Sequence, residues 1–160
     1  MKYFFFLLCV CMSALYSCKN AAAIDLAAEK TSMSKADIAF SDLSKQKGMK
    51  AAFLEYIDTA GVLLRPNHYP IVGRDARQFL QEANDSSFTL TWEPSAAEVG
   101  AAGDLGFTYG IYTLTIADTA IKGTYVSVWK KQADGNLCWI QAIPALVQRN
   151  KPFLAFEISS

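Results

Sequence analysis

Asp58 is the acidic residue whose position most strongly suggests chemistry. It follows a stretch of helical periodicity and is therefore predicted near a helix C-terminus, where a carboxylate opposes the helix dipole. Two interpretations account for this placement: a general base at the mouth of a pocket, or a solvated acid in the turn that leads into a strand. Because residues two apart on a helix do not share a face, Tyr56 and Asp58 contact one ligand only if the helix ends near Ile57.

Aromatic side chains on predicted strands are the candidate lining of such a pocket. Alternation along residues 123–131 puts Tyr125 and Trp129 on one face and Val126 and Val128 on the other, and we expect the aromatic face to border the cavity. Plain core packing is the alternative for each ring. The predicted lining consists of Tyr56, Trp92, Tyr109, Tyr112, Tyr125, Trp129 and Gln141, with Trp139 as a further aromatic on a strand.

Other chemistries have little support in the sequence. The single histidine, His68, lies in a proline-flanked loop without partners at metal-ligand spacing, so no metal site is expected. A G-x-S-x-G motif is absent, and the glycines between residues 100 and 110 fit a hairpin turn and not a phosphate loop. We therefore expect no cofactor. Fifteen basic residues balance fifteen acidic ones without a basic cluster, which argues against nucleic acid as a partner.

Three of the four cysteines lie in the amino-terminal segment. Cys9 and Cys11 fall inside its apolar stretch and Cys18 ends it, which leaves Cys138 alone in the predicted domain. No internal disulfide is therefore expected in the mature protein. A lone cysteine on a strand is typically a small buried apolar residue, and a reactive thiol is the alternative for Cys138.

The amino terminus has the organisation of a signal peptide. Lys2 precedes an apolar run over residues 3–15, which is shorter than the roughly 20 residues that a membrane-spanning helix needs. The run ends in Leu15-Tyr16-Ser17-Cys18, which resembles the lipobox of bacterial lipoproteins, although Tyr16 is bulkier than the usual residue there. The resemblance implies cleavage before Cys18 and lipidation of its thiol. The alternative is secretion, with cleavage after the alanines at 21–23.

These features predict a location and three segments. The chain would be anchored in the cell envelope by acyl chains on Cys18. Because no Asp follows the cysteine at the second position, we expect the outer membrane, facing the periplasm. Residues 1–17 are the predicted lipoprotein signal peptide, 18–35 a lipidated tether, and 36–160 a single domain.

The domain is predicted to begin with helices and to end in strands. A helix capped by Ser32 or Ser34 carries Ile38, Phe40 and Leu43 on its apolar stripe, and Gly48 kinks it or divides it in two. Short strands at 62–67 and 69–73 and a helix at 74–84 follow. Four alternating strands are predicted at 88–93, 107–116, 123–131 and 137–143, with turns at 103–106, 117–120 and 134–136. This order is an α+β pattern.

Several sequence segments resemble those of the nuclear transport factor 2-like superfamily, which includes ketosteroid isomerase and the SnoaL polyketide cyclases. They are residues 62–67 with 71–73, Leu90-Thr91-Trp92-Glu93-Pro94, 103–110, and 123–132 followed by Asp134-Gly135. The resemblance extends over about residues 36–143. It implies an α+β fold shaped as a cone, in which N-terminal helices pack on a strongly curved antiparallel sheet around a pocket.

The resemblance leaves three functions open. The first is an envelope lipoprotein whose pocket binds a small, largely apolar molecule, with little or no catalysis. The second is an isomerase, cyclase or hydrolase of the SnoaL or ketosteroid isomerase type with Asp58 as base. An acid that these relatives carry on the last strand is missing, however, since Gln141 and Ala142 stand there. The third is an interaction module that forms a homodimer through the outer sheet face.

Overall fold

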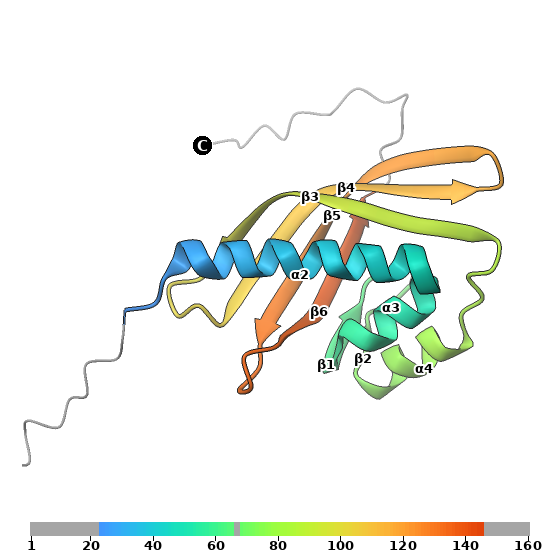
Figure 1. Cartoon of the computed structure of the whole chain (residues 1–160). Helices are drawn as coiled ribbons and strands as arrows, with labels where there is room; N and C mark the ends of the chain where they lie inside the picture. The colour runs from blue at the N-terminus through green and yellow to red at the C-terminus, as the bar shows by residue number, and fades with distance from the viewer. Residues whose placement is uncertain (1–22, 66–67, 146–160) are drawn as a thin grey trace, which may run out of the picture.

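The structure is a computed structural model that describes residues 23–65 and 68–145, and the side chains as far as Ile140 apart from Pro66 and Asn67. The predicted signal peptide and the lipidation residue Cys18 lie outside the described residues. Within them, no helix is both long enough and apolar enough to cross a membrane. The described chain folds as two layers, with helices packed on one side of a curved sheet (Figure 1).

The first helix, α2 (Leu26–Lys47), begins six residues before Ser32, the earlier of the two predicted caps, Ser32 and Ser34. Its cap is Asp25, whose carboxylate accepts hydrogen bonds from the backbone N–H groups of Ala27 and Ala28, both at 3.0 Å. Residues 26–35 are therefore helical and not an irregular tether, and Met33 among them is fully buried. The prediction of the helix start was wrong because this stretch has few apolar side chains to set a period.

Gly48 ends α2 and divides it from α3 (Met49–Tyr56), so of the two predicted alternatives, a kink or a division, the structure has the division. The glycine has φ of 90°, a conformation that residues with a Cβ adopt at a cost. Asp85 fills the space beside Gly48 and accepts a hydrogen bond from the backbone N–H of Lys50 at 2.8 Å. The carboxylate thus caps α3 at its N-terminus, a role that no side chain within α3 takes.

One six-stranded sheet accounts for most of the remaining structure. Its strands, with α4 between the second and third, follow α3 in this order: β1 (Ile57–Leu63), β2 (Ile71–Val72), α4 (Arg74–Glu82), β3 (Phe88–Val99), β4 (Leu105–Ile116), β5 (Thr119–Lys131) and β6 (Leu137–Ala145). The spatial order is β2-β1-β6-β5-β4-β3. The turns predicted before β4, between β4 and β5 and between β5 and β6 are confirmed, and β3 to β6 form the expected meander.

The sheet is mixed, whereas the sequence predicted an antiparallel one. β1 and β6 pair in parallel, with Ile57 opposite Trp139 and Leu63 opposite Ala142. A short turn forces neighbouring strands to be antiparallel, but these two strands are separated by most of the domain and are free of that constraint. The register shifts within three pairings, including one between Pro94 and Ala96 of β3, and such bulges help a sheet to curve.

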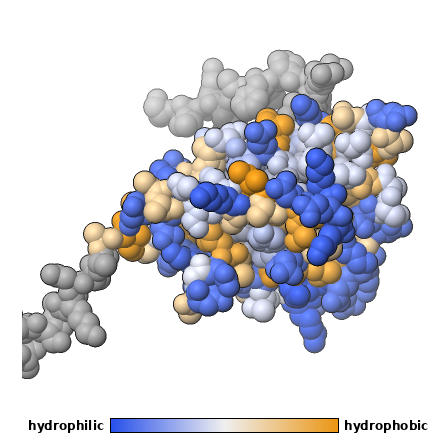
Figure 2. All heavy atoms as spheres, in the orientation of Figure 1, coloured by the Kyte–Doolittle hydropathy of each residue, from blue (hydrophilic) through white to orange (hydrophobic). Residues whose placement is uncertain are grey.

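The helices cover the inner, concave face of the sheet. Figure 1 shows α2 running across the strands, with α3 and α4 beside its C-terminal end. Of the predicted apolar stripe on α2, Phe40 is 1 % exposed and Leu43 is half-buried against the core, but Ile38 is 46 % exposed. The stripe that actually packs on the sheet consists of Met33, Asp37, Phe40, Ser41 and Ser44. Figure 2 shows the outward side of α2, where hydrophilic residues surround separate hydrophobic ones.

Candidate functional site

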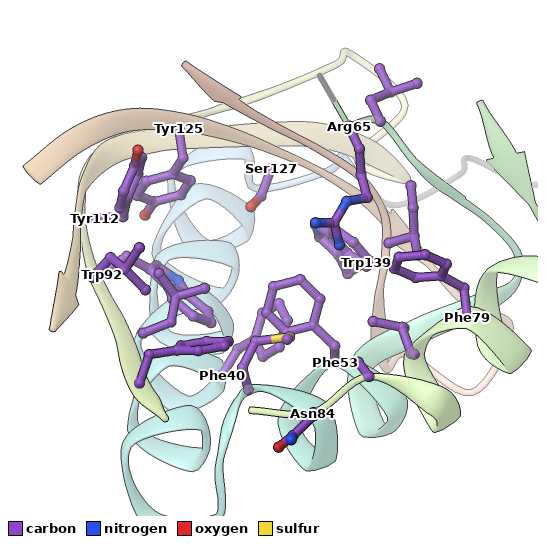
Figure 3. A pocket seen from close by; sticks show the side chains of 18 residues that line it. Phe40, Phe53, Arg65, Phe79, Asn84, Trp92, Tyr112, Tyr125, Ser127 and Trp139 are labelled. Carbon is purple, nitrogen blue, oxygen red and sulfur yellow. The ribbon is translucent and has the colours of Figure 1, made fainter. Parts of the chain in front are cut away.

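A cavity of about 580 Å³ lies between the helices and the inner face of the sheet. That volume falls within the range of small-molecule sites. Figure 3 shows the side chains of its wall, and most of them are aromatic or aliphatic. The helices contribute Phe40, Met49, Phe53, Phe79 and Leu80, and the strands contribute Leu63, Phe88, Leu90, Trp92, Tyr112, Leu114, Tyr125, Ser127 and Trp139. Arg65 and Asn84 line it as exposed residues, which places them at the rim.

Three of the predicted lining residues border this cavity: Trp92, Tyr112 and Tyr125. Trp92 comes from β3, Tyr112 from β4 and Tyr125 from β5, and all three point to the helix side of the sheet. Tyr112 lies opposite Gly123, and a Cβ at Gly123 would come within 2.5 Å of the tyrosine ring. Because Gly123 has no side chain, the Tyr112 ring can pack over it and line the cavity wall.

Other predicted lining residues lie elsewhere. Tyr109 is 44 % exposed on the outer face of β4, because its position in the alternation is opposite to that of Tyr112. Trp129 faces inward as expected, but it is fully buried in the core beside the cavity. Tyr56 packs on the core with its ring stacked on Phe40 at 4.5 Å between centroids. Gln141 is on β6 opposite Val128, and its side chain lies outside the described set.

Asp58, the predicted base, is outside the cavity wall. The helix does end at Tyr56, but Asp58 belongs to β1 and is not among the residues that line the cavity. It accepts hydrogen bonds from the Ala60 backbone N–H at 2.7 Å and from Gln132 Nε2 at 2.7 Å. The bond from Ala60 lowers the pKa of Asp58, against the opposing effect of burial, and Gln132 adds to it. An acid held ionised away from the cavity is poorly suited to act there as a base.

Asp37 of α2, which the sequence interpretation missed, is an acid bonded to the cavity wall. It is 0 % exposed and accepts two hydrogen bonds of 2.7 Å, from Trp92 Nε1 at Oδ1 and from Tyr125 Oη at Oδ2. The only available signal was its spacing, since Asp37 lies four residues after Met33 and three before Phe40 on one helical stripe. A charged residue in that position is normally solvated, so the spacing alone does not indicate a site residue.

Burial governs the protonation of Asp37 and Tyr125. Desolvation raises the pKa of Asp37, while hydrogen bonds from Tyr125, Thr108 and Trp92 oppose that rise. Desolvation also raises the pKa of Tyr125, and the neighbouring Asp37 raises it further. Tyr125 is therefore a neutral donor at physiological pH. Because Asp37 is sealed behind Trp92 and Tyr125, it shapes the wall and does not meet a ligand directly.

Two further groups bear on the chemistry of the site. The indole Nε1–H of Trp139 is buried and has no hydrogen-bond partner among the described residues. Burial raises the pKa of the Cys138 thiol, and nearby Asp58 and Asp134 raise it too, so the thiol is poorly activated as a nucleophile. In residues 23–65 and 68–145, no three His, Cys, Asp or Glu side chains gather in a way that would hold a metal ion.

Comparison with solved structures identifies the architecture. A nuclear transport factor 2-like protein with a cystatin-like fold from Novosphingobium aromaticivorans superposes with a TM-score of 0.61 at 14% identity, covering 84% of this chain and 92% of its own. A ketosteroid isomerase-like protein from Erwinia carotovora gives 0.58 at 16% identity, covering 78% and 98%. An LEH-like epoxide hydrolase of M. tuberculosis gives 0.52 at 15% identity, covering 73% and 81%.

The described part of the chain therefore has the cone-shaped α+β fold of nuclear transport factor 2-like and ketosteroid isomerase-like proteins, as the sequence resemblance implied. No family model matches the sequence, and no curated protein matches it. At these identities the similarity establishes the fold alone, and the residues of the site have to carry any statement about function.

Proposed function

We propose that this protein is a cell-envelope lipoprotein whose cavity binds a small, largely apolar molecule without converting it. The observation that supports binding is the cavity itself, which is of ligand size and walled mainly by aromatic and aliphatic side chains. Burying an apolar ligand against such a wall is favourable by roughly 25 cal/mol for each Å² removed from water. The proposed anchor on Cys18 would keep the cavity at a membrane surface, with the outer membrane as the expected location.

Binding is favoured over catalysis because the acids are in the wrong places. A general base must come within hydrogen-bond reach of the proton that it removes. Asp58 does not line the cavity, and Asp37 is closed off from it by its own hydrogen bonds to Trp92 and Tyr125. The isomerase, cyclase or hydrolase alternative would need one of these acids to become exposed to the ligand.

Native mass spectrometry of the protein, purified from its host in mild detergent, tests this proposal. We expect a co-purifying small molecule and an acylated Cys18. A Leu90→Trp variant, which fills the cavity from β3, should lose the molecule. Thr89→Trp is the matched control, because Thr89 is exposed and has the opposite parity on the same strand. An empty wild-type protein, or equal loss in both variants, contradicts binding in this cavity, and an unmodified Cys18 contradicts the lipoprotein assignment.

A second function, as a dimeric interaction module, is supported by the outer face of β4. Four large apolar residues stand exposed there at alternate positions: Leu105, Phe107, Tyr109 and Ile111, each between 40 % and 48 % exposed. An alternating row of this kind is expected to be covered in solution, because contiguous apolar surface favours association. We propose that two copies meet through this row, a contact compatible with ligand binding on the inner face.

A further inference from the structure

Arg65 is the residue of the cavity wall that the apolar-ligand proposal does not explain. Among the described residues that line the cavity, it alone carries a formal charge. It directly follows Leu63 and Leu64, both of which face the same cavity, and its guanidinium points toward the cavity interior (Figure 3). Arg65 is exposed at the rim, but a ligand in the cavity would remove water from its guanidinium, and a guanidinium that loses water without gaining a partner is destabilising.

Among the described residues, no contact of Arg65 occupies its N–H donors. The guanidinium carbon lies 4.9 Å from the centroid of the Phe79 ring, which engages the flat face of the group. The N–H bonds lie in the guanidinium plane and are not used by that contact. Within the described residues, the ion pairs involve Lys30, Arg74 and Lys131, and no carboxylate lies at ion-pair distance from Arg65. The Ser127 hydroxyl also points into the cavity.

We propose that the natural ligand is an apolar carboxylic acid, whose carboxylate is bound by Arg65 at the rim while its hydrocarbon body lies against the aromatic wall. This inference rests on the proposed binding function and deepens it. Arg65 presents two parallel N–H donors, the geometry that matches a carboxylate. The inner wall around Trp92 and Leu114 is mainly apolar and suits the hydrocarbon end of such a molecule.

A monoanion fits this wall better than a dianion or a neutral molecule. Arg65 compensates one negative charge, and a second charge on a phosphate monoester would remain without a cation in an apolar cavity. A neutral alcohol would leave the guanidinium without an anionic partner. The order of affinity for ligands that share one hydrocarbon chain should therefore be carboxylate first, with the phosphate and the alcohol weaker.

Displacement of Nile red, a neutral apolar dye, separates binding in the cavity from recognition of the head group. The protein is the predicted mature chain from residue 18 carrying Cys18→Ser, which has neither the apolar amino-terminal run nor a lipid and therefore needs no detergent. Dodecanoate, dodecanol and dodecyl phosphate compete for the dye below their micelle concentrations. A charge-assisted pair should make dodecanoate about tenfold or more tighter than dodecanol. Arg65→Met keeps the apolar stem and should abolish this preference while leaving dodecanol affinity within about twofold.

The control is Arg74→Met, which removes an equal charge from a side chain that is 94% exposed outside the cavity wall. It should retain the preference for the carboxylate. If Nile red binds but dodecanoate is no tighter than dodecanol, or if Arg65→Met keeps the preference, the carboxylate proposal is overturned and the apolar binding function stands. If dodecyl phosphate binds more tightly than dodecanoate, the proposed preference for a monoanionic ligand is overturned. Failure of the dye and all three competitors to bind overturns both proposals.

Discussion

Tyr125 on β5 donates its phenolic hydrogen to Asp37 on α2 over 2.7 Å, joining residues that are 88 positions apart in the sequence. The same carboxylate accepts the indole hydrogen of Trp92 from β3. One buried acid thus connects the first helix to two strands, at the point where both aromatic residues line the cavity. The wall of the candidate site is therefore held by a polar cluster that the ligand does not touch.

Removing the Asp37 carboxylate should destabilise the fold strongly. Asp37→Ala leaves two buried donors without an acceptor, and each such loss costs roughly 1–3 kcal/mol. Asp37→Asn should cost less, because its oxygen can accept from Trp92 while the Tyr125 hydroxyl turns to accept from the amide. Urea unfolding measures both. Equal stability of the alanine variant and the wild type would show that the cluster contributes nothing.

The two buried acids should give the free energy of unfolding opposite dependences on pH. The folded pKa of Asp58 is lowered, so its contribution is present above the unfolded pKa and is lost as pH falls through the folded value. Burial raises the folded pKa of Asp37, so its contribution falls as pH rises from the unfolded pKa through the folded one. Relative to Asp58→Asn, the wild type should lose its advantage in acid.

Relative to Asp37→Asn, the wild type should instead gain stability as pH falls through the same region. Urea titrations of both pairs at a series of pH values measure the two slopes. Slopes of the same sign for the two pairs would contradict the assignment of opposite pKa shifts.

Two buried tryptophans should respond differently to loss of the indole N–H. Trp129 Nε1 donates to the Thr108 hydroxyl at 2.9 Å, whereas Trp139 Nε1 has no partner in the described structure. Trp→Phe removes similar volume at both sites. Trp129→Phe should therefore be more destabilising than Trp139→Phe by roughly 1 kcal/mol, because only the first variant breaks a hydrogen bond. Thermal and urea unfolding check this order, and the reverse order would mean that the Trp139 indole does have an acceptor.

Adding one methyl group at Gly123 should disturb the cavity wall. A Cβ there meets the Tyr112 ring, so Gly123→Ala displaces the ring or destabilises the fold by roughly 1–3 kcal/mol through overpacking. Near-ultraviolet circular dichroism and Nile red affinity should both change. Gly135→Ala is the control in open space, although its φ of 87° adds some backbone strain. An unchanged spectrum and affinity for Gly123→Ala would argue against this role of the glycine.

The proposed dimer predicts a simple sedimentation result. Tyr109→Lys places a charge within the exposed row on the outer face of β4, whose rings at Phe107 and Tyr109 lie 6.4 Å apart. We expect the wild type to sediment as a dimer and the variant as a monomer with the same circular dichroism. Gln78→Lys, at an exposed position on α4 on the opposite side of the sheet, should leave the dimer intact. A monomeric wild type would remove the basis for this proposal.

Element order was predictable from the sequence because local chemistry determines it. Gly48 divides the helices, Asp134-Gly135 turns the last hairpin, and strict alternation identifies β4 and β5. The start of α2 was missed since residues 26–35 bury little apart from Met33, and their helical state depends on the Asp25 cap and on packing against the sheet. The parallel pairing of β1 with β6 is a long-range contact that no local pattern encodes.

The candidate site was predictable only in part. Alternation predicts which residues of a strand share a face of the sheet, but it does not predict which residues on the inner face line the cavity and which are buried beside it. Tyr125 and Trp129 share the predicted inner face, but only Tyr125 reaches the cavity. Asp58 sits where the helix was expected to end, and its hydrogen bonds within β1 and to Gln132 could not be inferred from spacing. Asp37 breaks the rule that buried stripes are apolar, and its partners lie more than 50 residues away.

Polar bonds from three successive turns of α2 fix where the helix sits along the sheet. Asp37 accepts from Trp92 and Tyr125, Ser41 accepts from the Trp92 backbone N–H, and Ser44 donates to the Leu90 carbonyl. Apolar side chains alone would tolerate a helix shifted by one turn, about 5.4 Å, because apolar contacts are not directional and the shifted helix presents a similar apolar surface. The hydrogen bonds of Asp37, Ser41 and Ser44 therefore select one position of α2 along the sheet, because a helix shifted by one turn would lose all of them together.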